Sequence, residues 1–175
     1  MKVKDISNER ESLSIVHEFN APKKLVFNAF AKEDALAAWW GPVECKNSVI
    51  KLEFREGGFF HYKMEKDGNI NYGRFTFGKI QPYDMLEFFN SFSDEHGNII
   101  RAPFDIQLPL KIFYRLTFTE TRGKTIISMT GTPMEATPEE IQNLKSINKN
   151  IKEGFGASFN QLSKYLDKIQ SNSKY

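Results

Sequence analysis

The residues that most often carry chemistry are few in this chain and lie far apart. His17, His61 and His96 each fall on or beside a different predicted element, and none has the spacing of metal ligands. Cys45 is the only cysteine, which excludes an internal disulfide and a zinc site made of cysteines. No base is placed beside Cys45 by the sequence, so we interpret it as a small buried hydrophobe. The sequence thus identifies no catalytic pair, favours a protein that is not an enzyme, and predicts no metal and no cofactor.

Aromatic side chains are the feature that exceeds expectation. The chain has 16 Phe, 6 Tyr and 2 Trp in 175 residues. Aromatic rings cover a large apolar area with few rotamers, so this excess predicts either a bulky core or an aromatic-lined cavity.

The elements that would hold these rings can be predicted from periodicity. Apolar residues recur every three or four positions between residues 138 and 170, which predicts one long amphipathic helix that begins with a capping box at Thr137 and Glu140. A first strand is expected at residues 11–19 and two short helices follow it, the second at residues 32–39. Turn residues divide the middle of the chain into strands near residues 44–54, 58–66, 69–80, 84–92, 111–120 and 124–133. Residues 99–110 are predicted to be an irregular excursion.

This order predicts an α+β fold in which a strongly curved antiparallel sheet wraps around the C-terminal helix. The chain length suits one domain, residues 1–175, with its core at about 11–170. Space between sheet and helix would be lined by side chains that alternation directs inward, by two indoles that end the second short helix, and by small residues on the long helix. The candidate ligand-binding residues are Trp39, Trp40, Phe60, Tyr62, Phe88, Tyr114, Gly154, Phe155 and Ser158. The alternative is that these aromatics simply fill the core.

Charge and hydropathy limit the partners. Lys and Arg total 24 and Asp and Glu total 22, so the net charge of +2 argues against a nucleic-acid partner. The sequence has no apolar run long enough to cross a membrane, and residues 1–19 have no signal-peptide core. We therefore expect a cytoplasmic protein without membrane insertion.

Several short motifs resemble one known family in their order and spacing. They are Phe27-Asn28-Ala29-Phe30, Ala38-Trp39-Trp40-Gly41-Pro42, Glu53 to Gly58, Gly73 ahead of an aromatic strand, Gly123-Lys124-Thr125 and Gly154-Phe155-Gly156. Over about residues 11–170 the chain resembles the SRPBCC superfamily and, within it, the group named for the C-terminal domain of the activator of Hsp90 ATPase. The resemblance implies the helix-grip fold with a hydrophobic cavity. Phe155 stands where the family often has Trp, and the additional N-terminal domain of the eukaryotic co-chaperone is absent from this sequence.

Three functions follow as hypotheses. The first is binding of a small apolar or amphipathic molecule between the sheet and the long helix, which a closed aromatic cavity of about 300 Å³ or more would favour. The second is a co-chaperone-like module that binds a chaperone or another protein partner, which exposed apolar patches on the sheet would favour. The third, with the least support, is a cyclase- or hydrolase-type enzyme.

Overall fold

The computed structural model describes residues 13–172 of the chain. The elements in chain order are β1 (Leu13–Phe19), α2 (Lys23–Ala31), α3 (Glu33–Trp39), β2 (Lys46–Leu52), β3 (Phe59–Lys66), β4 (Asn69–Gln81), β5 (Met85–Ser93), β6 (Ile99–Ile100), β7 (Lys111–Thr121), β8 (Lys124–Met134), α4 (Pro138–Ser146) and α5 (Asn148–Asn172). Each predicted strand of the middle region is present with its ends within two residues of the expected positions. The first strand starts at Leu13, and residues 11 and 12 of its prediction lie outside the described residues.

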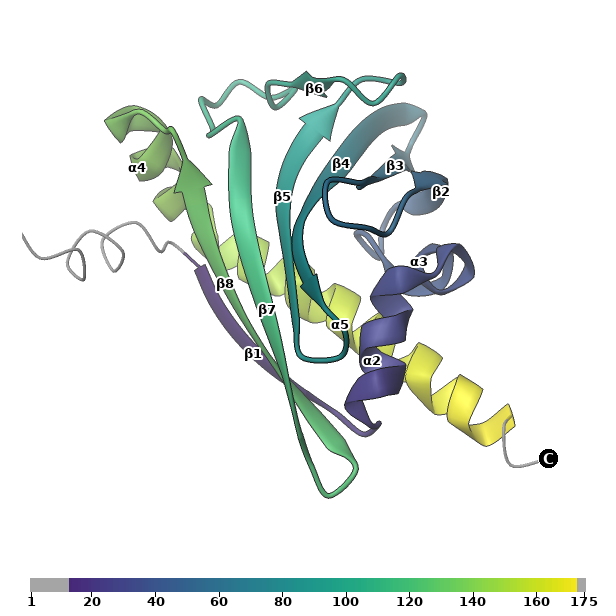
Figure 1. Cartoon of the computed structure of the whole chain (residues 1–175). Helices are drawn as coiled ribbons and strands as arrows, with labels where there is room; N and C mark the ends of the chain where they lie inside the picture. Colours follow the sequence, from purple (N-terminus) through teal and green to yellow (C-terminus); the bar gives the residue numbers. More distant parts are fainter. Residues whose placement is uncertain (1–12, 173–175) are drawn as a thin grey trace, which may run out of the picture.

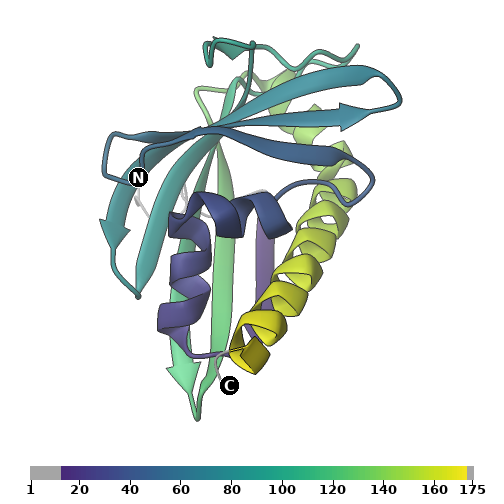
Figure 2. The ribbon, with the colours of Figure 1, turned by 90° about the vertical axis from the view of Figure 1, so that its right-hand side faces the viewer.

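The strands form one antiparallel sheet that bends around α5 (Figures 1 and 2). Its order is β1-β8-β7-β5-β4-β3-β2, and the two-residue strand β6 pairs with β5 beside this path. The pairing register shifts in β2 between Val49 and Lys51 and in β4 between Phe77 and Ile80. Such irregularities increase the local twist of a strand and help a sheet to curve. The predicted α+β helix-grip architecture is confirmed.

The C-terminal helical region differs from the prediction in one respect. The capping box is present, because the Thr137 hydroxyl accepts from the Glu140 backbone N–H at 3.1 Å and the Glu140 carboxylate accepts from the Thr137 backbone N–H at 2.9 Å. The single predicted helix is nevertheless two helices, α4 and α5, which meet at Ile147 with φ −105° and ψ 7°. At this point the Ser146 hydroxyl donates to the Asn143 carbonyl at 2.6 Å. Such a side-chain bond to the preceding turn commonly bends a helix.

The core lies between the concave face of the sheet and α5. The apolar repeat predicts burial of Ile151, Phe155, Phe159 and Leu162; the last three are buried together with Leu166, with Phe159 only 1% exposed, whereas Ile151 is half-buried. The inward-facing side chains of the central strands meet them, and α2 and α3 close one end of the same face (Figure 2). Helix and sheet therefore bury one shared apolar layer.

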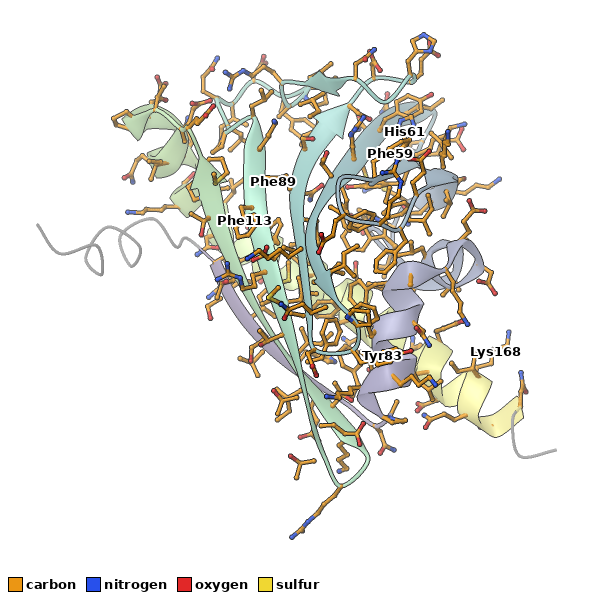
Figure 3. The ribbon with its side chains drawn as sticks, in the orientation of Figure 1. Phe59, His61, Tyr83, Phe89, Phe113 and Lys168 are labelled. Atoms are coloured by element: carbon orange, nitrogen blue, oxygen red, sulfur yellow. The ribbon has the colours of Figure 1, made fainter. Side chains whose placement is uncertain are left out.

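The convex face of the sheet carries aromatic side chains beside paired charges. Phe89 and Phe113 are cross-strand partners with ring centroids 5.2 Å apart (Figure 3). Alternation along the strands places them on the face opposite to the buried Phe88 and Tyr114. His61 also lies on this face. Its Nε2 atom is 3.1 Å from the carbonyl oxygen of Asp94, and the residue is buried beneath the β5–β6 turn.

Candidate ligand-binding cavity

A cavity of about 240 Å³ lies between the concave face of the sheet and the first half of α5. Four parts of the chain form its wall: residues 40–42 directly after α3, the central strands β3, β4, β5 and β7, the segment 102–110 before β7, and α5. The lining residues are Trp40, Gly41, Pro42, Tyr62, Met64, Gly73, Asn90, Ser91, Phe92, Ala102, Leu108, Pro109, Leu110, Ile112, Ile151, Gly154, Phe155 and Ser158. None of these side chains is charged, and most are apolar.

Tyr62 lies against the sheet because the opposite residue has no side chain. Tyr62 and Gly73 are direct partners in the β3–β4 register. A Cβ atom on Gly73 would be only 2.2 Å from the Tyr62 ring, so any other residue would push the phenol away from the sheet. The same arrangement places Tyr114 over Gly131 in the β7–β8 pair, where an added Cβ would lie 2.7 Å from the Tyr114 ring. Glycine therefore fixes the positions of both inward-facing tyrosines.

Tyr62 and its neighbours bring three polar groups together in the cavity, and Ser91, another lining residue, has a buried hydroxyl without a hydrogen-bond partner among the described residues. The Tyr62 hydroxyl donates to Oδ1 of Asn90 at 3.1 Å. The Trp40 indole packs edge-on against the Tyr62 ring with centroids 5.7 Å apart, and its buried N–H has no hydrogen-bond partner among the described residues. Burial raises the pKa of Tyr62, although the neighbouring Trp40 and Asn90 side chains act in the opposite direction. The phenol consequently stays neutral at physiological pH.

The α5 side of the cavity combines a tight attachment with open space. The Ser158 hydroxyl donates to the Gly41 carbonyl at 2.9 Å, which fastens α5 to the loop after α3. One helical turn earlier, Gly154 lines the cavity at a solvent-exposed position, and an added Cβ there would meet no neighbouring atom within 4 Å. Ser158 therefore holds the wall in place, whereas Gly154 leaves room in it.

The segment between β6 and β7 forms the rim of the cavity and is tied to α4. The Arg101 guanidinium makes an ion pair with the buried Glu140 carboxylate, and the Asn143 amide donates to the Gln107 carbonyl at 2.9 Å. These contacts position Leu108 and the two residues after it against the cavity. The rim thus depends on the same glutamate that caps α4.

The structure separates the predicted site residues into two groups. Those that line the cavity are Trp40, Tyr62, Gly154, Phe155 and Ser158. Those that lie in the core behind its wall are Trp39, Phe60, Phe88 and Tyr114. Trp39 is the clearest case, because its indole N–H donates to the Ala29 carbonyl at 2.9 Å and so joins α3 to α2. Phe88 stacks on Phe75 with ring centroids 3.9 Å apart.

Sequence reasoning missed the contribution of the rim. Ala102, Leu108, Pro109 and Leu110 line the cavity from a segment that we had predicted only to be irregular. Its apolar residues have no helical or strand period, so no pattern indicated which of them point inward. Asn90 did carry a signal, since it is a polar residue that alternates with inward-facing aromatics along β5.

The groups that were considered for catalysis stay apart from one another. Cys45 precedes β2 and is half-buried, and its pKa is raised by burial and by the charge of Glu44, which disfavours the reactive thiolate. His61 lies on the convex face. Within residues 13–172, no three His, Cys, Asp or Glu side chains gather closely enough to hold a metal ion. Neither α5 nor any other described helix has the length and apolar character that crossing a membrane requires.

The fold and the cavity define a helix-grip protein with a small, uncharged space beside its long helix. The sequence model of the activator of Hsp90 ATPase homolog 1-like protein family matches residues 20–167, and the chain belongs to this family. No curated protein sequence matches the chain.

Solved structures give the same fold. A solution structure of a protein from Arthrobacter aurescens is 29% identical, with a TM-score of 0.74, over 89% of this chain and 85% of that one. A crystal structure of a protein from Mycobacterium smegmatis is 27% identical, with a TM-score of 0.70, over 87% of this chain and 88% of that one.

Proposed function

We propose that this protein binds a small apolar or amphipathic molecule in the cavity between the sheet and α5, without transforming it. The observation that carries the proposal is the uncharged wall of a space of about 240 Å³ next to a helix position, Gly154, that leaves room in it. A wall of this kind suits an apolar ligand, because apolar surface is favourably removed from water there.

The size of the cavity restricts the ligand. Pockets for drug-sized molecules occupy roughly 300 to 1,000 Å³, and this cavity of about 240 Å³ is smaller than the 300 Å³ that would favour small-molecule binding by size alone. A molecule of one or two rings, or a short branched chain, suits it better than a long acyl chain. This limit narrows the first hypothesis and leaves it in place.

The alternative of a protein-interaction module has weaker support. Val16 on β1 is well exposed, and a second group of exposed apolar residues lies near Phe92: Ile70 and Ile100 line one surface hollow with it, and the Phe104 ring is 5.4 Å from the Phe92 ring. On the convex face, the Arg115 guanidinium is paired with the Glu87 carboxylate at 2.7 Å. A patch of a few apolar residues is common on monomeric proteins and does not by itself indicate a partner.

The proposal is tested by a titration of the ¹⁵N-labelled protein with 2-ethylnaphthalene, followed by NMR. We expect saturable shifts of the backbone amides around the cavity, at Leu108, Ile112, Ile151 and Gly154. An absence of saturable shifts, or shifts confined to the convex face, would contradict a binding site between the sheet and α5.

A further inference from the structure

Asn90 is an amide in an otherwise apolar row across the concave face of the sheet. Its cross-strand partners are Phe75 on β4 and Ile112 on β7, and paired residues of an antiparallel sheet point to the same side. Asn90 lines the cavity together with Ile112. Asn90 is half-buried, so its amide can offer hydrogen bonds to a molecule in the cavity from an otherwise apolar row.

The orientation of the Asn90 amide follows from its neighbours. The Tyr62 hydroxyl donates to Oδ1 of Asn90 at 3.1 Å, and only the oxygen end of an amide can accept such a bond. This direction leaves Nδ2 of Asn90 as the free end of the amide. Among the described residues, no hydrogen bond from Nδ2 is present.

The wall adds a second restriction, which concerns charge. None of the lining residues is Lys, Arg, Asp or Glu. A carboxylate or an ammonium group in this space would lose its hydration without gaining an opposite charge, which strongly disfavours its binding. A neutral oxygen, in contrast, would gain the hydrogen bond that Asn90 can donate.

We infer that the cavity selects uncharged, mainly apolar molecules that carry a neutral hydrogen-bond acceptor, such as a ketone, ester or amide carbonyl, and that Asn90 donates its Nδ2 hydrogen to this oxygen. Tyr62 is a positioning residue, because it holds the amide in the orientation that presents the donor. The inference rests on the proposed function and specifies the chemical class of the ligand.

Three matched probes test it: 2-acetylnaphthalene, which has a ketone oxygen, 2-ethylnaphthalene, which has none, and 2-naphthoate, which is an anion. The affinities are measured for the full-length protein and for Asn90→Leu, and the quantity compared is the ratio of acetyl to ethyl affinity. This ratio cancels the different water solubilities of the two neutral probes. We expect the ratio of acetyl to ethyl affinity to be about fivefold higher in the unaltered protein than in Asn90→Leu, because one net hydrogen bond is worth about this factor.

The unaltered protein supplies a second measurement in case Asn90→Leu does not fold. The side-chain amide signals of Asn90 should shift when 2-acetylnaphthalene binds and shift much less with 2-ethylnaphthalene, and 2-naphthoate should bind weakest. The inference would be overturned by any of three results: equal affinity ratios in the two proteins, equal amide shifts with both neutral probes, or tightest binding of 2-naphthoate. None of these results would contradict the proposed binding function. Failure of both neutral probes to bind the unaltered protein would overturn the proposed function as well.

Discussion

Replacement of Gly154 by leucine tests whether the space beside α5 is empty and used. Gly154 lies inside α5 and lines the cavity, and an added Cβ would meet no neighbouring atom within 4 Å. Glycine is less favourable in a helix than leucine by about 0.8 kcal/mol. We therefore expect Gly154→Leu to raise the unfolding free energy by roughly this amount, which for a chain of this size corresponds to an increase in Tm of about 2 to 3 °C.

The same side chain should compete with a ligand. Its atoms would extend into the wall of a cavity of about 240 Å³, so we expect the affinity for 2-acetylnaphthalene to fall by about tenfold or more. Thermal unfolding followed by circular dichroism and calorimetric titration of the probe measure the two effects.

Gly156→Leu is the matched control. Gly156 lies on the same helix and an added Cβ there also meets no neighbouring atom within 4 Å, but Gly156 does not line the cavity. The control should gain similar stability and keep its affinity for the probe. A Gly154→Leu protein that loses about 1 to 3 kcal/mol of stability would show a packed core at this position, and one that binds the probe as tightly as the control would place the ligand elsewhere.

Three other predictions concern the core, the unused reactive groups and pH. Phe159→Ala should lower the unfolding free energy in a denaturant titration by about 3 to 5 kcal/mol, and a loss below about 1 kcal/mol would contradict its central place in the core. Cys45→Ala should leave the unfolding free energy nearly unchanged. His61→Ala should lower the unfolding free energy by about 2 kcal/mol, because the buried ring contacts a loop carbonyl. Neither substitution should change the affinity for the probe. The hydrogen bond from the Thr137 backbone holds the pKa of the Glu140 carboxyl below its usual 4.5. The ionised Glu140 therefore contributes its full stabilisation above about pH 4.5, and this stabilisation is lost as the pH falls through the lowered pKa. Glu140→Gln should flatten that part of the stability profile, and an unchanged profile would show that Glu140 does not cause it.

The sequence was sufficient to predict the sheet and the packing face of α5, because both depend on periodicity. Leu162 and Leu166 continue the apolar repeat and are buried, and the strands end where turn residues interrupt alternation. The break at Ile147 was not predictable in this way, because it accompanies a local hydrogen bond of a serine hydroxyl. Periodicity describes the faces of a helix and contains no information on where its axis bends.

The cavity was predictable only in part. Trp39 and Trp40 are adjacent in sequence and seemed equivalent, but α3 ends between them, so that one indole enters the core and the other reaches the cavity. The rim residues have no periodic pattern, and their place depends on contacts with α4 that are distant in sequence. Tertiary contacts of this kind determine which aromatic residues remain accessible to a ligand.

The most direct test of the proposed function is native mass spectrometry of the protein purified from its own host. We predict a species heavier than the 20.2 kDa polypeptide by the mass of one small neutral molecule, present in the unaltered protein and in Gly156→Leu and lost in Gly154→Leu. The proposed binding function would be contradicted if all three preparations showed only the bare polypeptide and neither 2-ethylnaphthalene nor 2-acetylnaphthalene bound saturably.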